Sequence, residues 1–422
     1  MGLRKKGYVL FLAILAMALV AGCTGKEAPT SDKKANVTLN AIFMKQAGYS
    51  EDAIKEATDA FTKENPHIKV ETTFVPYEVL EQKIVVGNGN YDVMLVDAPW
   101  TAKLANVNML YDVTSKLKDE DRKDIFGGAL SAMEYDGKLY GMPWLNDVKY
   151  LFYNKEMLEQ AGITKVPGTW EEVAAASKTL KEKGIVEYPL VWSWKQAEAL
   201  ICDFTLLTAS FGGKFVDGEK VTIDDPANVK ALEFMKATMK DGLTNPSSAE
   251  YLEEDVRAIF SSGKAAFALN WAYMLGLANE DPRESKVVGK VGIAPIPGTA
   301  GAKGATVNGG MGLAISKESK HADEAWQYIQ YLSSKEFQKK HTADAPPVWK
   351  SLFEDQEAVS ANPELLEVSK VQYESIANRA QVPWYGHFST KLQVSIHEAL
   401  FDKKSPQEAL GELNAAMLEI VQ

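Results

Sequence analysis

Cysteine and histidine are scarce in this sequence, with two cysteines and five histidines among 422 residues. Cys23 belongs to an N-terminal signal described below, which leaves Cys202 with no partner for a structural disulfide. Because Cys202 lies in an apolar run, it is predicted to be a buried thiol. His387 and His397 lie ten residues apart, which is not a metal-site spacing. The sequence thus predicts no metal and no cofactor.

The motifs of common catalytic sites are also missing. The sequence has no nucleophile elbow, no Gly-rich phosphate loop and no HExxH pattern, the arrangements that bring a nucleophile, a phosphate or a zinc ion to a reacting bond. These absences favour a protein that is not an enzyme.

Positive charge is not in excess, because 46 lysines and arginines stand against 57 aspartates and glutamates, for a net charge of -11. Nucleic acids and anionic membrane surfaces need clustered positive charge, so neither is an expected partner. A ligand can be neutral or cationic. The hydrophobic content of 46% and charged content of 24% are those of a soluble globular protein with a sizeable core.

The longest apolar run lies near the N-terminus, from Tyr8 to Ala21, behind the basic residues 4–6. It is shorter than the roughly 20 residues needed to cross a bilayer and is typical of a secretory signal. Val-Ala-Gly-Cys at 20–23 resembles the lipobox at which bacterial lipoproteins are cleaved and acylated. We predict a lipoprotein signal peptide over 1–22 and a lipid on Cys23. An uncleaved anchor helix, or an ordinary signal peptide with a chance cysteine, is the alternative.

Residues 23–36 are polar and are predicted to be a flexible tether. The rest of the chain is too long for one ordinary core, which suggests two lobes. Its first part alternates between predicted strands at 37–43, 68–74 and 93–96 and predicted helices at 50–64 and 79–86. This βαβαβ succession implies a largely parallel sheet.

Two strand-like runs, 140–144 and 149–153, flank residues 145–148, where we place a crossover between the lobes. Thr-Trp-Glu-Glu at 169–172 is typical of a capping box and begins a helix that is predicted to end near residue 183. Further helices are predicted over 197–210, 226–241, 252–262, 322–340 and 406–421, and further strands over 265–269, 291–294 and 312–315.

Short patterns along the chain match a known family in their order. They are Tyr-Asp-Val at 91–93 leading to Asp97 and Trp100, Tyr-Asn-Lys-Glu at 153–156, Pro-Gly-Thr-Trp at 167–170, Gly-Lys-Ala-Ala-Phe at 263–267, Asn-Trp at 270–271, Gly-Gly-Met-Gly-Leu-Ala-Ile at 309–315 and Ala-Asp-Glu-Ala-Trp at 322–326. Together they resemble the extracellular solute-binding proteins of carbohydrate ABC importers, the maltose- and trehalose-type binding proteins. The resemblance spans essentially the whole mature chain.

The resemblance implies an α/β fold of the periplasmic-binding-protein type, in which two lobes close on the ligand by hinge motion. Each lobe is expected to be discontinuous, with 37–146 plus 295–317 in the N-terminal lobe and 147–294 plus 318–422 in the C-terminal lobe. The implied partners are a sugar, the permease subunits of an ABC importer and the membrane, through the N-terminal lipid. We expect a monomer that is lipid-anchored on the extracytoplasmic face of the cell membrane.

A sugar presents hydroxyls at its rim and flat C–H faces, so its site needs charged or amide groups and aromatic rings. Ligands of doubly wound sheets lie beyond the carboxyl ends of the strands, and Asp97 follows the predicted strand 93–96. Asp97 is therefore predicted to contact the ligand, with a helix N-cap before Pro99 as the alternative. Asp147 lies at the predicted crossover, where the resemblance places an acidic sugar-binding residue; a hinge salt bridge is the equal alternative.

The aromatic candidates form two pairs. Trp271 and Tyr273 follow the strand 265–269 and match the aromatic stacking segment of the family, with core packing as the alternative. Trp192 and Trp194 alternate, so on a strand both would point to one side and form a stacking platform. Packing of this second pair in the core is equally compatible with the sequence.

Three further residues complete the predicted site. Gly310 would let the backbone approach the ligand closely; many relatives carry tryptophan beside this glycine, where Met311 stands here, so the kind and size of sugar stay open. Arg379 is predicted to bind sugar hydroxyls as a cationic fork, with a surface ion pair as the alternative. Gln46, after the first strand, would contribute an amide.

We therefore predict a protein that captures a sugar, foremost an oligosaccharide, in an interlobe cleft and delivers it to a permease. A secreted carbohydrate-active enzyme is one alternative, because Asp97, Asp147 and the tryptophans would suit a two-carboxylate sugar site. A receptor that reports ligand occupancy to a membrane sensor is another. An amino acid, a peptide or a phosphorylated polyol stays open as the ligand, although no basic cluster marks a phosphate.

Overall fold

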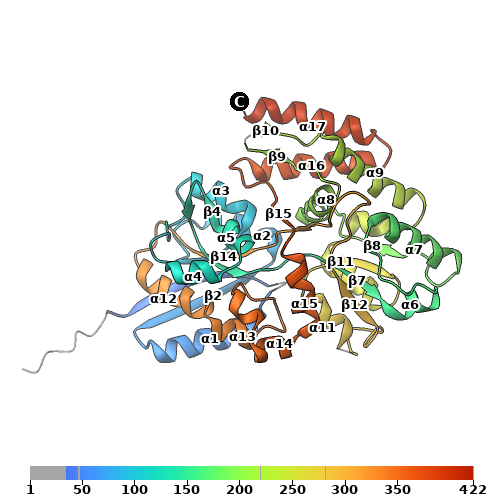
Figure 1. Cartoon of the computed structure of the whole chain (residues 1–422). Helices are drawn as coiled ribbons and strands as arrows, with labels where there is room; N and C mark the ends of the chain where they lie inside the picture. The colour runs from blue at the N-terminus through green and yellow to red at the C-terminus, as the bar shows by residue number, and fades with distance from the viewer. Residues whose placement is uncertain (1–34, 46–47, 219, 281, 422) are drawn as a thin grey trace, which may run out of the picture. The chain divides into compact units, whose positions relative to one another are not determined.

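The computed structural model describes residues 35–45, 48–218, 220–280 and 282–421. Within this part of the chain, two β-sheets and the helices that cover them form two α/β lobes (Figure 1). This is the predicted fold class. Cys23 and Gln46, two of the predicted functional residues, lie outside the described residues.

The first sheet has the strand order β2-β1-β3-β14-β6. Its strands are β1 (Val37–Met44), β2 (Ile68–Val75), β3 (Val93–Asp97), β6 (Met142–Leu145) and β14 (Met311–Ile315). β1 runs parallel to β2 and β3, and the connections pass through α1 (Glu51–Glu64) and α2 (Tyr77–Val86). β14 runs antiparallel to both β3 and β6. The predicted βαβαβ unit is confirmed.

The second sheet has the strand order β12-β7-β11-β8. Its strands are β7 (Tyr150–Asn154), β8 (Leu190–Val191), β11 (Phe267–Asn270) and β12 (Val291–Ala294). β7 is antiparallel to β11 and β12, whereas β11 is parallel to β8. The helix α7 (Trp170–Glu182) packs its apolar face into the core on this side. Its predicted capping box is confirmed, since Thr169 and Glu172 each accept a hydrogen bond from the other's backbone N–H.

The chain passes between the sheets more than once. Residues 146–149 join β6 to β7 at the predicted crossover, and residues 295–310 lead from β12 back to β14. A third passage follows α14 (Gln356–Ala361), because α15 (Pro363–Gln372) contributes Leu365 to the core of the second sheet. Both lobes are therefore discontinuous in sequence.

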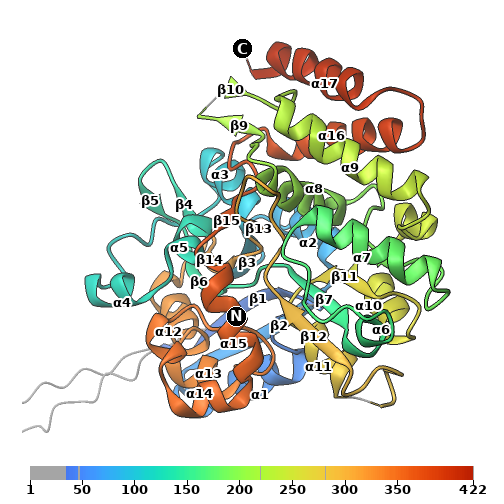
Figure 2. The same ribbon diagram turned by 45° about the vertical axis from the view of Figure 1, so that its right-hand side comes forward.

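Two late helices, α12 (Ala322–Leu332) and α13 (Lys335–Lys340), belong to the first core. Trp326 and Ile329 of α12 share that core with Phe61 of α1, and Figures 1 and 2 show the two helices beside α1. The sequence-based division puts 318–422 in the C-terminal lobe. These contacts favour a revised division, and we propose that residues 322–358 belong to the N-terminal lobe.

The helix predicted over 322–340 is two helices, because Ser334 begins α13 by accepting a hydrogen bond from the backbone of Phe337 at 3.1 Å. The other elements are α3 (Ala98–Asn106), α4 (Asp119–Asp124), α5 (Gly127–Met133), β4 (Glu134–Tyr135), β5 (Lys138–Leu139), α6 (Lys155–Gln160), α8 (Glu198–Ser210), β9 (Val216–Asp217), β10 (Lys220–Val221), α9 (Pro226–Lys240), η1 (Pro246–Glu250), α10 (Glu253–Ser261), α11 (Met274–Asn279), β13 (Thr306–Val307), η2 (Lys350–Phe353), β15 (Ile376–Ala377), α16 (Tyr385–Leu400) and α17 (Pro406–Val421). Across the described ranges, no helix combines the length and apolar character needed to cross a membrane.

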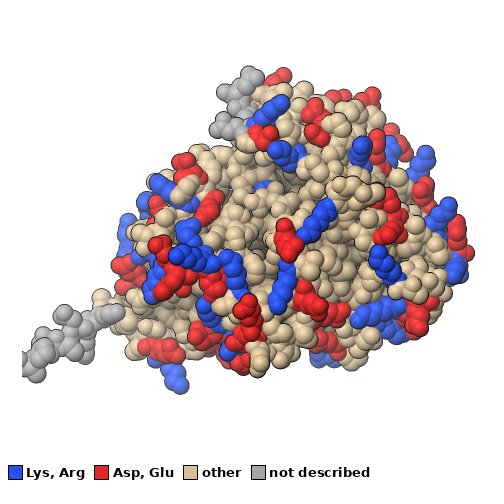
Figure 3. All heavy atoms as spheres, in the orientation of Figure 1, with Lys and Arg blue, Asp and Glu red and all other residues tan. Residues whose placement is uncertain are grey.

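Charged side chains of both signs are interspersed over the face shown in Figure 3. Lysines and arginines on this face alternate with aspartates and glutamates and form no continuous basic surface.

Candidate functional site

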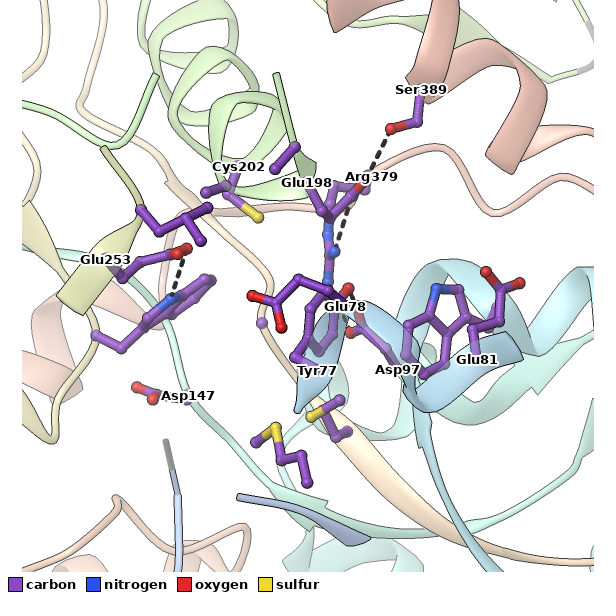
Figure 4. A pocket seen from close by; sticks show the side chains of 18 of the residues that line it. Tyr77, Glu78, Glu81, Asp97, Asp147, Glu198, Cys202, Glu253, Arg379 and Ser389 are labelled. Carbon is purple, nitrogen blue, oxygen red and sulfur yellow. Dashed lines mark hydrogen bonds and ion pairs between the residues drawn. The ribbon is translucent and has the colours of Figure 1, made fainter. Parts of the chain in front are cut away.

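A cavity of about 700 Å³ is lined by residues of both lobes (Figure 4). The first lobe contributes residues at strand ends and on α2, namely Met44, Tyr77, Glu78, Asp97, Leu145 and Met311. The second contributes residues of α8, α10, α16 and the segment after β11, namely Glu198, Glu253, Trp271, Tyr273 and Ser389. The cavity lies at the carboxyl end of β3, where the sequence predicts a ligand.

A buried ion-pair network links the two lobes beside this cavity. Arg379, only 3% exposed, places Nη2 at 2.7 Å from Oδ1 of Asp97 and Nη1 at 3.0 Å from Oε1 of Glu198. Asp97 ends β3, whereas Glu198 begins α8, so the guanidinium of Arg379 joins the two lobes. We call Asp97, Arg379 and Glu198 the lobe bridge. Both carboxylates of the lobe bridge accept further hydrogen bonds, which compensate for their burial.

Neighbouring hydroxyls donate hydrogen bonds to both carboxylates of the lobe bridge. Tyr77 donates to Oδ2 of Asp97 at 2.7 Å, Ser389 donates to Oε2 of Glu198 at 2.7 Å, and Tyr385 donates to Oε1 of Glu198. Burial raises the pKa of Glu198, and Arg379 opposes that shift. Burial alone would lower the pKa of Arg379, but the acidic groups around it, Asp97 foremost, together outweigh burial and the pKa is raised. The guanidinium is therefore charged at any pH at which the protein is folded.

Asp97 and Arg379 thus fulfil more than one of the roles considered from the sequence. Asp97 lines the cavity and is also the N-cap of α3, since its Oδ1 accepts from the backbone of Ala98 at 2.8 Å. Arg379 lines the cavity as well, but its ion pair is buried between the lobes instead of lying at the surface.

Asp147 lies in the crossover between β6 and β7 and lines the cavity, with 5% of its surface exposed. Its Oδ1 accepts backbone hydrogen bonds from Val148 at 2.9 Å and Ala272 at 3.2 Å. No ion pair to Asp147 exists in the part of the chain that the structure describes, so the hinge salt bridge considered from the sequence is not found there. Burial raises the pKa of Asp147 to about 7, against the lowering effect of the two backbone N–H groups.

Trp271 follows β11 and is partly buried at the cavity wall. Its Nε1 donates to Oε1 of Glu253 at 3.3 Å, and Nζ of Lys149 lies 5.2 Å from its ring centroid, within reach of a cation–π contact. The ring also lies against Gly309, where an added Cβ would come within 2.3 Å of it. The absence of a side chain at Gly309 therefore sets the position of this aromatic face.

A fully buried lysine, Lys149, contacts both Trp271 and Glu253. Nζ of Lys149 lies 2.7 Å from Oδ1 of Asp203, 3.0 Å from Oγ of Ser193 and 3.6 Å from Oε1 of Glu253. Burial lowers the pKa of Lys149, but the acidic groups around it, Asp203 and Glu253 foremost, together outweigh burial and the pKa is raised. The ammonium group thus stays charged and anchors the cavity wall.

The remaining sequence candidates divide between the cavity and the core. Tyr273 lines the cavity. Trp192 and Trp194 are buried in the second core, where their rings stack with centroids 4.9 Å apart, and neither lines the cavity. Gly310 is buried beside it, and its neighbours Gly309 and Met311 line the cavity instead. Cys202 is a buried free thiol, as predicted, at the cavity wall.

Several cavity residues could not be selected from the sequence. Tyr77 and Glu253 lie on helices whose apolar faces are the only signal, and Glu198 carries no motif. Lys149, which is buried behind the cavity wall, carries no motif either. One signal was available for Glu198, since it begins the predicted helix 197–210 near the opposite lobe. No group of three or more metal-ligating side chains is assembled within the described ranges.

The fold and the site together define a two-lobe binding protein with a ligand-sized cavity between its lobes. The chain belongs to the family of bacterial extracellular solute-binding proteins, whose sequence model matches residues 47–339. The protein is therefore extracytoplasmic.

Individual relatives agree with this assignment. A probable ABC transporter-binding protein of Deinococcus radiodurans is 28% identical over 420 residues, covering 96% of this chain and 98% of that protein. The maltose-bound MalE3 of T. maritima is 29% identical with a TM-score of 0.83, covering 91% of this chain and 99% of that one. The GacH receptor of Streptomyces glaucescens, solved unliganded and with acarbose, is 25% identical with a TM-score of 0.80, covering 92% of this chain and 99% of that one.

Replacing Arg379 with methionine should destabilise the protein strongly. The change leaves Asp97 and Glu198 buried without their cation, which costs about 3–5 kcal/mol. Urea unfolding measures this loss. Lys103→Met is the matched control, because Lys103 pairs with Glu81 at 2.8 Å with both side chains partly exposed, and the expected cost is about 0–1 kcal/mol. Equal losses in the two variants would contradict the structural role of the lobe bridge.

Replacing Asp147 with asparagine should stabilise the empty protein at high pH. Because the pKa of Asp147 is raised from 3.8 to about 7 on folding, the folded state holds the proton more tightly than the unfolded chain. Ionisation therefore costs stability, beginning as the pH rises above the unfolded value and complete above about 7, by at most about 4 kcal/mol. The side-chain amide of the variant cannot ionise, so the variant avoids this cost.

The measurement is the unfolding free energy of both proteins across that pH range. The advantage of Asp147→Asn should be absent in acid and should grow to its full size above neutral pH. A difference between the two proteins that does not depend on pH would contradict the assignment.

Proposed function

We propose that a monomer of this protein captures a sugar in the cavity and delivers it to the permease subunits of an ABC importer. The observation that carries the proposal is the composition of the cavity wall. The partly exposed ring of Trp271 offers a flat apolar face, while Asp147 and Glu253 offer carboxylates beside it. A sugar has flat C–H faces and a rim of hydroxyls, so it needs both kinds of group.

Two further observations support a sugar and favour an oligosaccharide. A volume of about 700 Å³ lies well within the range of small-molecule sites, roughly 300–1,000 Å³. Solved relatives hold maltose or acarbose. The lobes that close around the cavity give the permease two distinguishable states to recognise, open and ligand-closed.

Binding without reaction is the favoured outcome. A glycoside hydrolase needs two carboxyl groups that act together on one bond, one of them as a proton donor. Asp97 and Glu198 are both committed to Arg379 by ion pairs, and Asp147 has a raised pKa without such a commitment. Of the two aspartates that the sequence offers for a two-carboxylate mechanism, Asp97 is thus held in an ion pair and only Asp147 is not, which suits a hydrogen bond to a ligand better than joint action on one bond.

The proposal is tested first with a thermal-shift screen of mono- and oligosaccharides, polyols, amino acids and peptides, followed by calorimetry on each hit. Trp271→Ala should weaken sugar binding at least about tenfold, because the loss of a buried aromatic face exceeds about 1.4 kcal/mol. The stability of the empty variant should change little, since the ring is only partly buried. Trp192→Ala is the control and should cost about 3–5 kcal/mol of stability without weakening binding by the folded fraction.

Two results would contradict the proposal. Unaltered affinity in Trp271→Ala would remove the ring from the site. Recovery of cleaved sugar after incubation would identify an enzyme instead of a binding protein.

We further propose that the protein is a lipoprotein, held at the membrane by a lipid on Cys23. The support is the apolar run and the small residues before Cys23 in the sequence. Cells fed with radioactive fatty acid should label the natural protein, and Cys23→Ala should abolish the label. Persistent labelling of the variant would refute the anchor.

A further inference from the structure

The cavity is lined by many more acidic than basic side chains. Among the described residues that line it, eight are acidic and only Arg379 is basic. The acidic residues are Glu78, Glu81, Asp97, Asp147, Glu198, Glu253, Glu254 and Asp255. Figure 4 shows the carboxylates of Glu78, Asp147 and Glu253 around the same open space. A neutral sugar does not require such an excess.

Nearby cations neutralise only part of this excess, since Lys103 pairs with Glu81 at 2.8 Å and Arg257 pairs with Glu254 at 2.9 Å. Arg379 is shared by two carboxylates of the lobe bridge, which leaves that group with one net negative charge. Lys149 is shared between Asp203 and Glu253. These pairs therefore keep a net negative charge near the cavity, where the surrounding protein screens it less than bulk water would.

Asp147 is a buried carboxylate of the cavity wall that has no ion pair among the described residues. It is 5% exposed, and both of its hydrogen bonds end on Oδ1, from the backbones of Val148 and Ala272. Its Oδ2 has no hydrogen-bond partner in the described chain, and Asp147 is one of the residues that line the cavity. A buried carboxylate is costly unless a cation or several donors compensate it, and a bound ligand can provide that compensation.

We infer that the ligand is a sugar that carries a positive charge, of the amino-sugar class, and that its ammonium group binds Oδ2 of Asp147. This inference rests on the proposed function and makes its ligand more specific. An ammonium group is a compact donor of three hydrogen bonds, so it compensates both the charge and the open acceptor of Asp147. Trp271 adjoins this position, because the backbone of Ala272 binds the same carboxylate.

The test uses calorimetric titration at neutral pH and low salt with sugars paired by charge. The pairs are glucose with glucosamine, galactose with galactosamine, and cellobiose with the disaccharide of glucosamine. One ammonium group replaces one hydroxyl in each monosaccharide pair, and two replace two in the disaccharide pair. In whichever pair binds, the cationic sugar should bind at least tenfold more tightly than its neutral partner. Added salt should reduce the ratio of the two affinities.

Two variants locate the effect. Asp147→Asn should bring the ratio of the two affinities close to one. Asp59→Asn removes the same charge from an exposed position on α1 and should leave the ratio unchanged.

The outcomes separate the inference from the proposed function. Equal affinities within a pair, or a preference that survives in Asp147→Asn, would overturn the inference while sugar binding itself stands. Failure of every sugar, charged or neutral, to bind would overturn the proposed function and the inference with it.

Discussion

The buried contact of Arg379 with Asp97 and Glu198 is the interaction on which the arrangement of the site depends. One guanidinium joins the end of a strand in the first sheet to the start of a helix in the second lobe, at 2.7 Å and 3.0 Å. Breaking a buried charge pair is costly because it leaves an uncompensated charge, so this contact favours the geometry in which the two lobes meet in this structure. The cavity, Trp271 and Asp147 are arranged around that geometry.

The local structure could largely be predicted from the sequence because it depends on short-range patterns. Alternating and continuous apolar runs predict β1, β2 and β3, and the Thr-Trp-Glu-Glu pattern predicts the start of α7. The helix over 322–340 is split at Ser334 because the side chain of this residue caps a new helix, an outcome that apolar periodicity alone does not reveal. Its membership of the first core depends on tertiary contacts and could not be predicted from periodicity.

In the site, too, features that depend on neighbouring residues could be predicted from the sequence, whereas contacts between distant residues could not. Asp97 could be predicted to line the site because it follows a buried strand, and ligands of such sheets lie beyond the carboxyl ends of the strands. The pairing of Asp97 with Arg379 joins residues that are far apart in the chain, and no local signal announces it. Trp192 and Trp271 are both tryptophans near strand ends, yet one is in the core and the other at the cavity. Gly309 leaves room for the ring of Trp271 at the cavity, whereas Trp192 stacks against Trp194 in the core.

The most direct test of this account is a crystal structure of the protein with a sugar that it binds in solution. The account predicts the sugar between the lobes, with one face against the ring of Trp271, a polar group within hydrogen-bond distance of Oδ2 of Asp147, and the Asp97–Arg379 pair intact. A sugar bound elsewhere on the protein, with the cavity unchanged, would contradict it.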